Sequence, residues 1–546
     1  MNKTHIVILG GGFAGAFAAK HLQRLDSQLT EVELINNTNY FVFQPLLPEV
    51  ASGTLRAADA VTPLRLMLPN VKVRMADVFK IDFDARRVRV VQGSKRIPRY
   101  VDYDHLVLAM GQQANLSFLP GFEDHSFTLK NVADAYSLRN HLIQRLEHAD
   151  ITTNTKLKKR LLTFIIAGAG FSGVETVGEM AEMMDKTLKY YPNISKHEIN
   201  CILIERGDRI LPELTTKLSE YVHKRLSKRG IKIYVNTSIT SATARAVYLD
   251  NGERILAGTI VTTIGNGPTE LVKASSLELK WGKIQTDEFL RVKGFENIWA
   301  IGDAALIPIK GLGSLEYVPP TAQFAVREAK CVANNILASM TSNSLQTFFY
   351  KPRGLMASIG NHAAVAEIFG FRMSGFFAWL MWRAFYISML PAFSTKIRVA
   401  FGWMVDILAR RDMVQIHTTS QQAACRYAHY AKGDVLFRPG QIIDGFYTVV
   451  TGKLESRSET PEGEEDFVRI LNPGDHWGER TIAGGFKTVS TLTAMEDTKV
   501  LILGRETFSK LQQSMPKLSE YFDRIEDQTY PQQLRANEKS ANSNKV

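Results

Sequence analysis

Two glycine-rich segments have the residue types and spacing that bind dinucleotides. The first reads Gly10-Gly11-Gly12-Phe13-Ala14-Gly15 and follows a short apolar run at residues 6–9. In such a turn the first glycine makes the tight bend, the second lets a pyrophosphate approach backbone N–H groups, and the third lets helix and strand pack closely. Gly10, Gly12 and Gly15 are therefore candidate ligands of a dinucleotide.

The same pattern recurs at Gly168, Gly170 and Gly173. Two complete fingerprints predict two dinucleotide sites and hence electron transfer from one dinucleotide to another. The strand that follows the second fingerprint ends at Glu205, whose carboxylate can accept hydrogen bonds from ribose hydroxyls and would repel the 2′-phosphate of NADP, so NADH is favoured there. The equivalent position after the first fingerprint is Asn36, which is neutral and can still bond a ribose hydroxyl.

The elements that position these turns alternate between strand and helix. Strands are predicted at residues 6–9 and 32–35 around a helix that ends near residue 22, and again at 162–167 and 201–204 around a helix from residue 174. This alternation predicts an α/β fold with two Rossmann-like domains.

Composition limits the class of protein. A chain of 546 residues suggests three or four domains, and 45% hydrophobic with 22% charged residues is typical of folded, mostly soluble proteins. Cys201, Cys331 and Cys425 are odd in number and far apart, so we expect no disulfide framework and no metal site. A reducing cytosolic setting fits this cysteine usage.

Several motifs together resemble the type II NADH dehydrogenases, single-chain flavoproteins that reduce quinone. They are the two fingerprints and the segments 39–50, 106–111, 174–175 and 297–303, and the resemblance covers residues 1–415. It implies that the first fingerprint holds FAD and the second NADH. The implied FAD residues are Gly10, Gly12, Gly15, Asn36, Pro45, Gly111, Gly302, Asp303 and Gln323, and the implied NADH residues are Gly168, Gly170, Gly173, Glu205 and Gly265.

The resemblance also implies two catalytic residues. Glu175 would lie near the nicotinamide and bias its binding or help to deliver protons, although a carboxylate there also stabilises a helix N-terminus. Gln323, in the segment 319–327, would present its amide to the flavin edge or to a quinone carbonyl. Asp303 would accept a hydrogen bond from the FAD ribitol, and it can also cap a helix. Arg327 stands where the family has a second glutamine, and it can also be a solvated side chain.

The expected function is transfer of hydride from NADH to FAD and of two electrons to a membrane quinone, without proton pumping. Because residues 43–53 contain no cysteine, a thiol substrate is disfavoured. Two alternatives stay open. One is an NADH-dependent reductase of a small iron–sulfur carrier, and the other is a non-enzymatic flavoprotein sensor that signals through its C-terminal domain.

A membrane contact is expected between residues 372 and 411. This stretch has nine aromatic residues, among them Trp379, Trp382 and Trp403, with six basic residues and one acidic residue. Such a composition favours amphipathic helices in a headgroup interface. A transmembrane span at 375–393 is disfavoured by Arg383 and Pro391, while a buried core or a homodimer interface is the third interpretation.

The distribution of charge supports the membrane interpretation. Residues 346–426 carry nine basic and three acidic residues, which accounts for more than half of the net charge of +11. We therefore expect an anionic membrane surface, rather than nucleic acid, as the partner, and a peripheral location on the cytoplasmic face of the cell membrane.

The C-terminal segment 427–520 resembles the jelly-roll cyclic nucleotide-binding domain. Gly478 and Glu479 match the pair that starts its phosphate cassette, and they are the candidate effector residues. Thr488 stands where the family has a phosphate-binding arginine, which is needed because a buried phosphate requires a paired cation. The favoured interpretation is a ligand-free docking or assembly module, with a nucleotide effector as the alternative.

The predicted domain boundaries follow from these assignments. They are an FAD-binding domain at 1–160 and 276–345, an NADH-binding domain at 161–275, a membrane-associating region at 346–415, a cyclic nucleotide-binding-like domain at 427–520 and a disordered tail at 526–546.

Overall fold

The computed structural model describes residues 3–24, 30–93, 96–310, 316–408, 411, 413–415, 424–459, 465–478, 488, 490–515, 517 and 521. The predicted tail at 526–546 and the effector candidate Glu479 lie outside these residues. The chain forms two compact units, one made of residues 1–115, 127–237 and 261–414, and the other of residues 116–126, 238–260 and 415–546.

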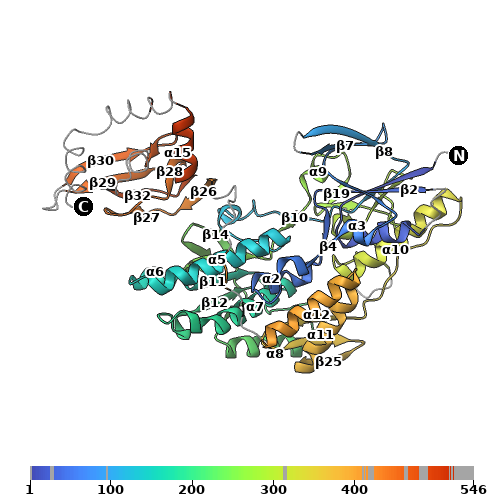
Figure 1. Cartoon of the computed structure of the whole chain (residues 1–546), viewed down its shortest axis with the longest axis horizontal. Coiled ribbons are helices and arrows are strands. Elements are labelled where there is room, and N and C mark those ends of the chain that lie inside the picture. The colour runs from blue at the N-terminus through green and yellow to red at the C-terminus, as the bar shows by residue number, and fades with distance from the viewer. Residues whose placement is uncertain are drawn as a thin grey trace. The chain divides into compact units, whose positions relative to one another are not determined.

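The first unit contains the two predicted parallel sheets (Figure 1). The larger has five strands in the order β21-β9-β1-β2-β5. The separate antiparallel meander β6-β7-β8 lies between β5 and β9 in the sequence. These strands are β1 (Thr4–Leu9), β2 (Thr30–Asn36), β5 (Lys72–Met75), β6 (Asp77–Asp82), β7 (Arg87–Gln92), β8 (Ile97–Asp102), β9 (His105–Leu108) and β21 (Ile298–Ala300). Helices α1 (Phe13–Leu22) and α10 (Ala322–Met340) pack against each other.

The second sheet has the strand order β13-β12-β11-β17. Its strands are β11 (Thr163–Ala167), β12 (Asn200–Ile204), β13 (Lys232–Tyr234) and β17 (Thr259–Thr262). The helices of this part are α5 (Val132–Ile151), α6 (Thr155–Leu161), α7 (Phe171–Thr187) and α8 (Thr216–Lys228). The two expected Rossmann-like sheets are thus confirmed, and α7 begins three residues before the predicted start at 174.

The end of the first unit adds a small sheet and two helices. Strands β23 (Gly354–Ser358), β24 (Ala364–Ile368) and β25 (Phe371–Gly375) form an antiparallel meander, followed by α11 (Phe376–Met389) and α12 (Phe393–Leu408), drawn in orange in Figure 1. None of the helices within the described ranges is both long and apolar enough to cross a bilayer.

The three tryptophans of this region are buried rather than exposed at an interface. Trp379, Trp382 and Trp403 are at most 5% exposed, and the Arg383 guanidinium lies between the rings of Trp379 and Trp403 at 4.3 and 4.2 Å from their centroids. These three tryptophans and Arg383 therefore do not belong to the exposed surface at which we expected the membrane contact. Stacking on two rings compensates part of the cost of burying the cation.

The second unit contains the jelly-roll. Its two antiparallel sheets have the orders β26-β33-β28-β31 and β27-β32-β29-β30, which confirms the expected all-β fold. The strands are β26 (Cys425–Tyr430), β27 (Val435–Phe437), β28 (Gly445–Thr451), β29 (Leu454–Glu459), β30 (Glu465–Leu471), β31 (His476–Trp477), β32 (Thr491–Ala494) and β33 (Thr498–Gly504), before helix α15 (Arg505–Ser514).

Two segments from much earlier in the chain belong to the same unit. They carry α4 (Phe122–His125) and the meander β14 (Ile239–Ala242), β15 (Ala246–Leu249) and β16 (Arg254–Leu256). The Ala244 N–H donates to the His429 carbonyl at 3.0 Å, and the Arg254 guanidinium donates to the buried Asp434 carboxylate at 2.7 Å. The ion pair joins chain segments 180 residues apart.

This pair can be tested by removing its cation. Replacing Arg254 by Met leaves the Asp434 carboxylate buried without its partner, so we expect a loss of about 1–2 kcal/mol in the stability of the second unit, reduced from the buried-pair value because Arg254 is partly exposed. Calorimetric unfolding of the full chain measures this loss. Arg438→Met, at an exposed arginine of the same domain, is the control and should change nothing. Equal melting profiles for both variants would contradict the role of the pair.

Candidate functional site

Both glycine fingerprints form the expected strand–turn–helix. The Gly10 N–H donates to the Ile35 carbonyl at 2.9 Å, and the Gly168 N–H donates to the Ile204 carbonyl at 2.8 Å, so each turn is fixed to the end of the neighbouring strand. Gly10 and Gly168 have φ values of +104° and +96°. These left-handed values favour glycine over any residue with a Cβ.

The third glycine of each fingerprint lets the helix approach the turn. A Cβ on Gly15 would lie 2.0 Å from the Gly10 carbonyl oxygen, and one on Gly173 would lie 1.8 Å from the Gly168 carbonyl oxygen. Around Gly12 and Gly170, by contrast, a Cβ would meet no atom within 4 Å. The second glycine therefore leaves open space in front of the helix N-terminus, where a phosphate can approach.

A cavity of about 670 Å³ opens at the first fingerprint. The residues that line it come from α1, α2 (Leu47–Ala51), α7 and α10 and from the loops after β2, β9 and β21. Among them are eight of the predicted residues, namely Gly10, Gly12, Asn36, Pro45, Gly111, Glu175, Gly302 and Asp303. Gly15 lies behind this wall, in contact with the turn.

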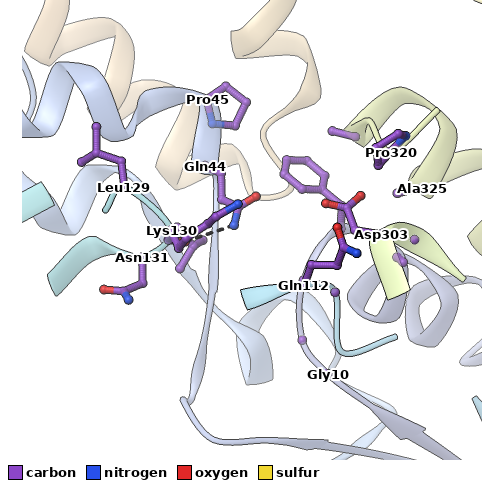
Figure 2. A pocket seen from close by; sticks show the side chains of 18 of the residues that line it. Gly10, Gln44, Pro45, Gln112, Leu129, Lys130, Asn131, Asp303, Pro320 and Ala325 are labelled. Atoms are coloured by element: carbon purple, nitrogen blue, oxygen red, sulfur yellow. Dashed lines mark hydrogen bonds between the residues drawn. The ribbon is translucent and has the colours of Figure 1, made fainter. Parts of the chain in front are cut away.

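Asp303 and Lys130 bring opposite charges to the cavity. Figure 2 shows Lys130 and Gln44 on one side of it, with Asp303 and Gln112 on the other. Burial raises the pKa of Asp303, and it lowers the pKa of Lys130. The Gln44 amide donates to the Lys130 carbonyl at 3.0 Å, which holds the Lys130 backbone at the cavity wall.

Glu175 lies on the cavity wall near the start of α7. Its carboxylate accepts hydrogen bonds from the Ser358 N–H at 3.1 Å and from the Trp382 indole N–H at 3.3 Å. Burial raises the pKa of Glu175 from 4.5 to about 8. The side chain can therefore hold a proton at neutral pH, as a group that takes part in proton transfer must.

Sequence reasoning missed three residues of this site. Lys130 and Tyr386 line the cavity, and the Glu328 carboxylate accepts a hydrogen bond from the Gly302 N–H at 2.6 Å. The Tyr386 ring packs edge-on against Phe43 and Trp382. No motif marks these positions, because each reaches the site only through the tertiary fold.

Gln323 is directed away from the cavity. Its amide donates to the Gly354 carbonyl at 2.9 Å and accepts from the Tyr350 hydroxyl at 3.2 Å. Arg327 lies over the Tyr350 ring at 4.9 Å from its centroid, so it is packed rather than freely solvated. The neighbours Pro320, Ala322 and Ala325 line the cavity instead.

The residues predicted for NADH surround the second fingerprint. The Glu205 carboxylate accepts hydrogen bonds from the Ala169 N–H at 2.7 Å and the Gly207 N–H at 2.8 Å, so it lies beside the turn. Gly265 has φ of +78°, and its carbonyl accepts from the Asn115 N–H at 2.7 Å. Phe171 and Ser172, at the start of α7, connect this turn to the cavity of the first fingerprint.

The effector position of the jelly-roll is described only in part. Gly478 has φ of +106°. Thr488 is buried, and its hydroxyl donates to the Ser490 carbonyl at 3.1 Å. A neutral, internally bonded side chain thus stands where a cyclic phosphate would need a cation.

Comparison with known proteins gives three matching family models. Residues 4–329 match the pyridine nucleotide-disulphide oxidoreductases, residues 353–412 match the NDH2 C-terminal domain, and residues 427–515 match the cyclic nucleotide-binding domain.

Among curated proteins, the type II NADH:quinone oxidoreductase Ndh of Mycobacterium tuberculosis is 30% identical over 445 residues, which cover 78% of this chain and 92% of that protein. The type II NADH:quinone oxidoreductase of Staphylococcus aureus is 30% identical over 381 residues, covering 68% and 92%.

Two solved structures share the fold. NDH2 of Plasmodium falciparum in complex with NADH has a TM-score of 0.70 at 22% identity and covers 76% of this chain and all of that chain. The sulfide:quinone oxidoreductase of Aquifex aeolicus has a TM-score of 0.57 at 18% identity and covers 76% and 96%.

The raised pKa of Glu175 predicts how stability depends on pH. Between pH 4.5 and about 8 the folded chain keeps a proton that the unfolded chain releases, so this group makes wild type less stable as pH rises, by up to about 1.4 kcal/mol per pH unit. Glu175→Gln removes that dependence. The denaturant midpoint of the variant should therefore rise relative to that of wild type as the pH increases from about 5 to about 8. A constant difference would mean that Glu175 is ionised in the fold.

Proposed function

Because this chain belongs to the type II NADH:quinone oxidoreductases, we propose that its cavity holds FAD and that the predicted site residues serve the oxidation of NADH by quinone. The chain is an enzyme of that family, and FAD and NADH are its cofactor and its electron donor. Transfer to an iron–sulfur carrier and a purely sensory role are not favoured, since its curated relatives are named as quinone oxidoreductases.

The residues around the cavity fit a flavin dinucleotide. Gly10 and Gly12 leave the N-terminus of α1 open to a pyrophosphate, and Gly15 allows the close packing behind it. The open space at Gly12, on the wall of the cavity and in front of the N-terminus of α1, is the observation that carries the assignment, because the backbone N–H groups of a helix N-terminus favour a phosphate.

The remaining FAD residues have complementary roles. Asn36 already accepts from the Gly11 N–H at 2.8 Å, so we assign it to holding the turn beside the ribose. The Gly302 backbone and the Asp303 carboxyl group would face the ribitol of FAD. Pro45 and Gly111 form part of the cavity wall. Gln323 bonds Gly354 and Tyr350, so we propose that it acts by fixing the loops near the cofactor.

The residues that line the cavity would hold FAD, whose chemistry when bound would be to accept a hydride from NADH and to give two electrons to the quinone. The chain provides position and charge. Lys130 and Asp303 set the electrostatic potential of the cavity, and Tyr386 with Phe43 forms its aromatic wall. Glu175, held by Ser358 and Trp382, keeps a proton close to the place of reaction.

The second fingerprint is proposed to bind NADH. Gly168, Gly170 and Gly173 build the pyrophosphate turn, Gly265 closes it, and the Glu205 carboxylate faces the ribose. A carboxylate at this place repels a 2′-phosphate.

Glu205→Gln tests this specificity. The amide keeps the shape of the side chain but removes the repulsion, so we expect kcat/KM for NADPH to rise about tenfold and that for NADH to fall by a smaller factor. Steady-state turnover with both nucleotides and a soluble quinone analogue measures the ratio. Glu253→Gln, at an exposed carboxylate on the β15–β16 turn, is the control. An unchanged ratio for Glu205→Gln would contradict its assignment.

We propose that α11, α12 and β25 form the membrane contact. Most of the large exposed side chains of these elements are apolar, and they are Phe371, Met373, Phe376, Phe377, Leu380, Phe393, Ile397, Phe401, Met404, Val405, Ile407 and Leu408. Exposed Arg372 and Arg398 lie on the same elements. Apolar surface with nearby cations favours an anionic headgroup layer, which is also where a quinone is available.

The membrane contact can be tested with two phenylalanines. Phe377 and Phe393 are 74% and 77% exposed, so Phe377→Ser with Phe393→Ser should weaken binding to anionic vesicles at least tenfold without reducing flavin content. Vesicle co-flotation measures this. The matched control is Phe79→Ser with Ile151→Ser, at residues 65% and 78% exposed elsewhere in the same unit. Equal binding by both double variants would contradict the assignment.

We also propose a location, an oligomeric state and a role for the jelly-roll. We place the enzyme peripherally, on the cytoplasmic face of the membrane, because its positive charge is concentrated near α11 and α12. A homodimer is compatible with the same apolar surface. The jelly-roll is assigned as a ligand-free module, since Thr488 replaces the phosphate-binding cation.

A further inference from the structure

One face of helix α7 carries a row of carboxylates into the protein core. Glu175, Glu179 and Glu182 lie four and three residues apart, so they share a face, and all three are at most 7% exposed. The row begins at the cavity, where Glu175 lines the wall. The row ends near Lys186. The side chain of Lys186 is 31% exposed, whereas the side chain of Glu182, taken without its backbone, is 10% exposed.

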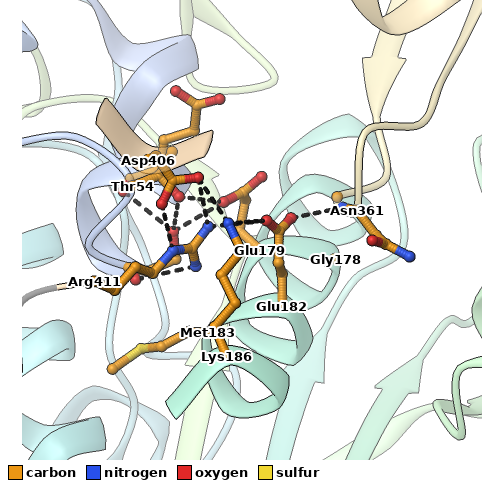
Figure 3. A network of polar contacts seen from close by, with 12 residues as sticks. Thr54, Gly178, Glu179, Glu182, Met183, Lys186, Asn361, Asp406 and Arg411 are labelled. Atoms are coloured by element: carbon orange, nitrogen blue, oxygen red, sulfur yellow. Dashed lines mark hydrogen bonds and ion pairs between the residues drawn. The ribbon is translucent and has the colours of Figure 1, made fainter. Parts of the chain in front are cut away.

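At the solvent end of the row, Glu182 belongs to a cluster of ion pairs. The Glu182 carboxylate accepts from Arg411 at 3.0 Å, from Lys186 at 2.9 Å and from the Asn361 N–H at 2.6 Å. Asp406 of α12 pairs with the same two cations, each at 2.8 Å. Figure 3 shows how these side chains converge beside α7. These ion pairs lower the pKa of Glu182, so this end of the row is ionised.

The middle of the row is bonded by hydroxyls instead. The Glu179 carboxylate accepts from the Ser52 hydroxyl at 2.9 Å and from the Thr54 hydroxyl at 3.0 Å, and within the described ranges no ion pair involves it. Glu49 of α2 is a fourth buried carboxylate, and it lies 3.7 Å from the Arg383 guanidinium; burial raises its pKa to about 8, and Glu179 raises it further. Burial also raises the pKa of Glu179. Buried acids without a direct cation partner are costly, and they persist in proteins mainly at functional sites.

The chemistry of the enzyme requires a proton from water. The balanced reaction is NADH + H⁺ + quinone → NAD⁺ + quinol. The hydride supplies both electrons and one of the two hydrogens, and the second must come from the solvent as a proton. Because a quinone enters from lipid, that proton needs a route through the protein.

Resting on the proposed function, we propose that Glu182, Glu179 and Glu175 form this route, which carries one proton per turnover from the Lys186 end of α7 to the cavity. Side chains at i and i+4 on a helix are about 5–6 Å apart at Cβ, a gap that the carboxyl groups span through a hydroxyl or one water. The Ser52 and Thr54 hydroxyls can each donate and accept, so they pass the proton at Glu179. Glu49 is a side branch that adjusts the charge of the row.

Glu179→Gln tests the route. The amide still accepts hydrogen bonds from Ser52 and Thr54 but no longer binds a proton. We expect kcat with a short-chain soluble quinone to fall at least tenfold and its solvent deuterium isotope effect to increase. Bleaching of the bound flavin by NADH without quinone, followed in stopped flow, should stay within twofold of wild type. Glu179→Asp, which keeps an ionisable group, should recover much of the quinone turnover.

A spectroscopic readout is independent of turnover. Infrared difference spectra of the oxidised and NADH-reduced protein should contain a protonated-carboxyl band that is missing in Glu179→Gln. Glu147→Gln is the control, because this carboxylate accepts from the Tyr191 hydroxyl at 3.0 Å and lies outside the row. It should match wild type in all of these measurements.

Three outcomes would overturn the route. The first is wild-type quinone turnover in Glu179→Gln, and the second is a carboxyl band that this substitution leaves unchanged. The third is an equal loss of rate in the NADH and quinone half-reactions that Glu179→Asp does not recover, because such a loss would mean that Glu179 has only a structural role. A wild-type protein that binds FAD and reacts with NADH but not with quinone would instead refute the proposed function, so the two failures are distinguishable.

Discussion

The site depends on the burial of one carboxylate. Glu175 is held by a backbone N–H of β23 and by the indole of Trp382 on α11. These two donors come from the end of the first unit, whereas Glu175 itself lies at the N-terminal end of α7, beside the second fingerprint. The cavity at the first fingerprint is thus closed by three distant parts of the chain. A buried acid that needs both donors ties their positions together more strictly than apolar packing alone.

The parts of the fold that are encoded locally could be predicted from the sequence. A fingerprint needs only six residues and its flanking strands, so both turns formed where the glycines predicted them. Contacts made by remote segments could not be predicted. Lys130, Glu328 and Tyr386 have no motif, and the bonds that Gln323 makes to Gly354 and Tyr350 depend on the packing of another segment. In the region of α11 and α12, composition alone could not predict which tryptophans and cations are buried, because it carries no information on the direction of a side chain.

The burial of Arg383 between Trp379 and Trp403 changes the meaning of that region. The aromatic residues with an N–H group are used inside, where Trp382 and Trp403 donate to Glu175 and Glu49. Phenylalanine and aliphatic side chains, which have no polar atom, are left on the outside. Helices α11 and α12 therefore bind the buried carboxylates Glu175 and Glu49 with one face and present an apolar surface with the other.

The division of the chain between two units has a consequence for biosynthesis. Segments 116–126 and 238–260 belong with the jelly-roll, although the ribosome makes them long before it. Ala244 and Arg254 meet His429 and Asp434 only after roughly another 170 to 190 residues, on the order of ten seconds or more of translation. Until then the Ala244 N–H and the Arg254 guanidinium lack these partners. The jelly-roll thus supplies partners to residues synthesised long before it, and a chain that terminates before it would leave the Ala244 N–H without the His429 carbonyl and the Arg254 guanidinium without the Asp434 carboxylate.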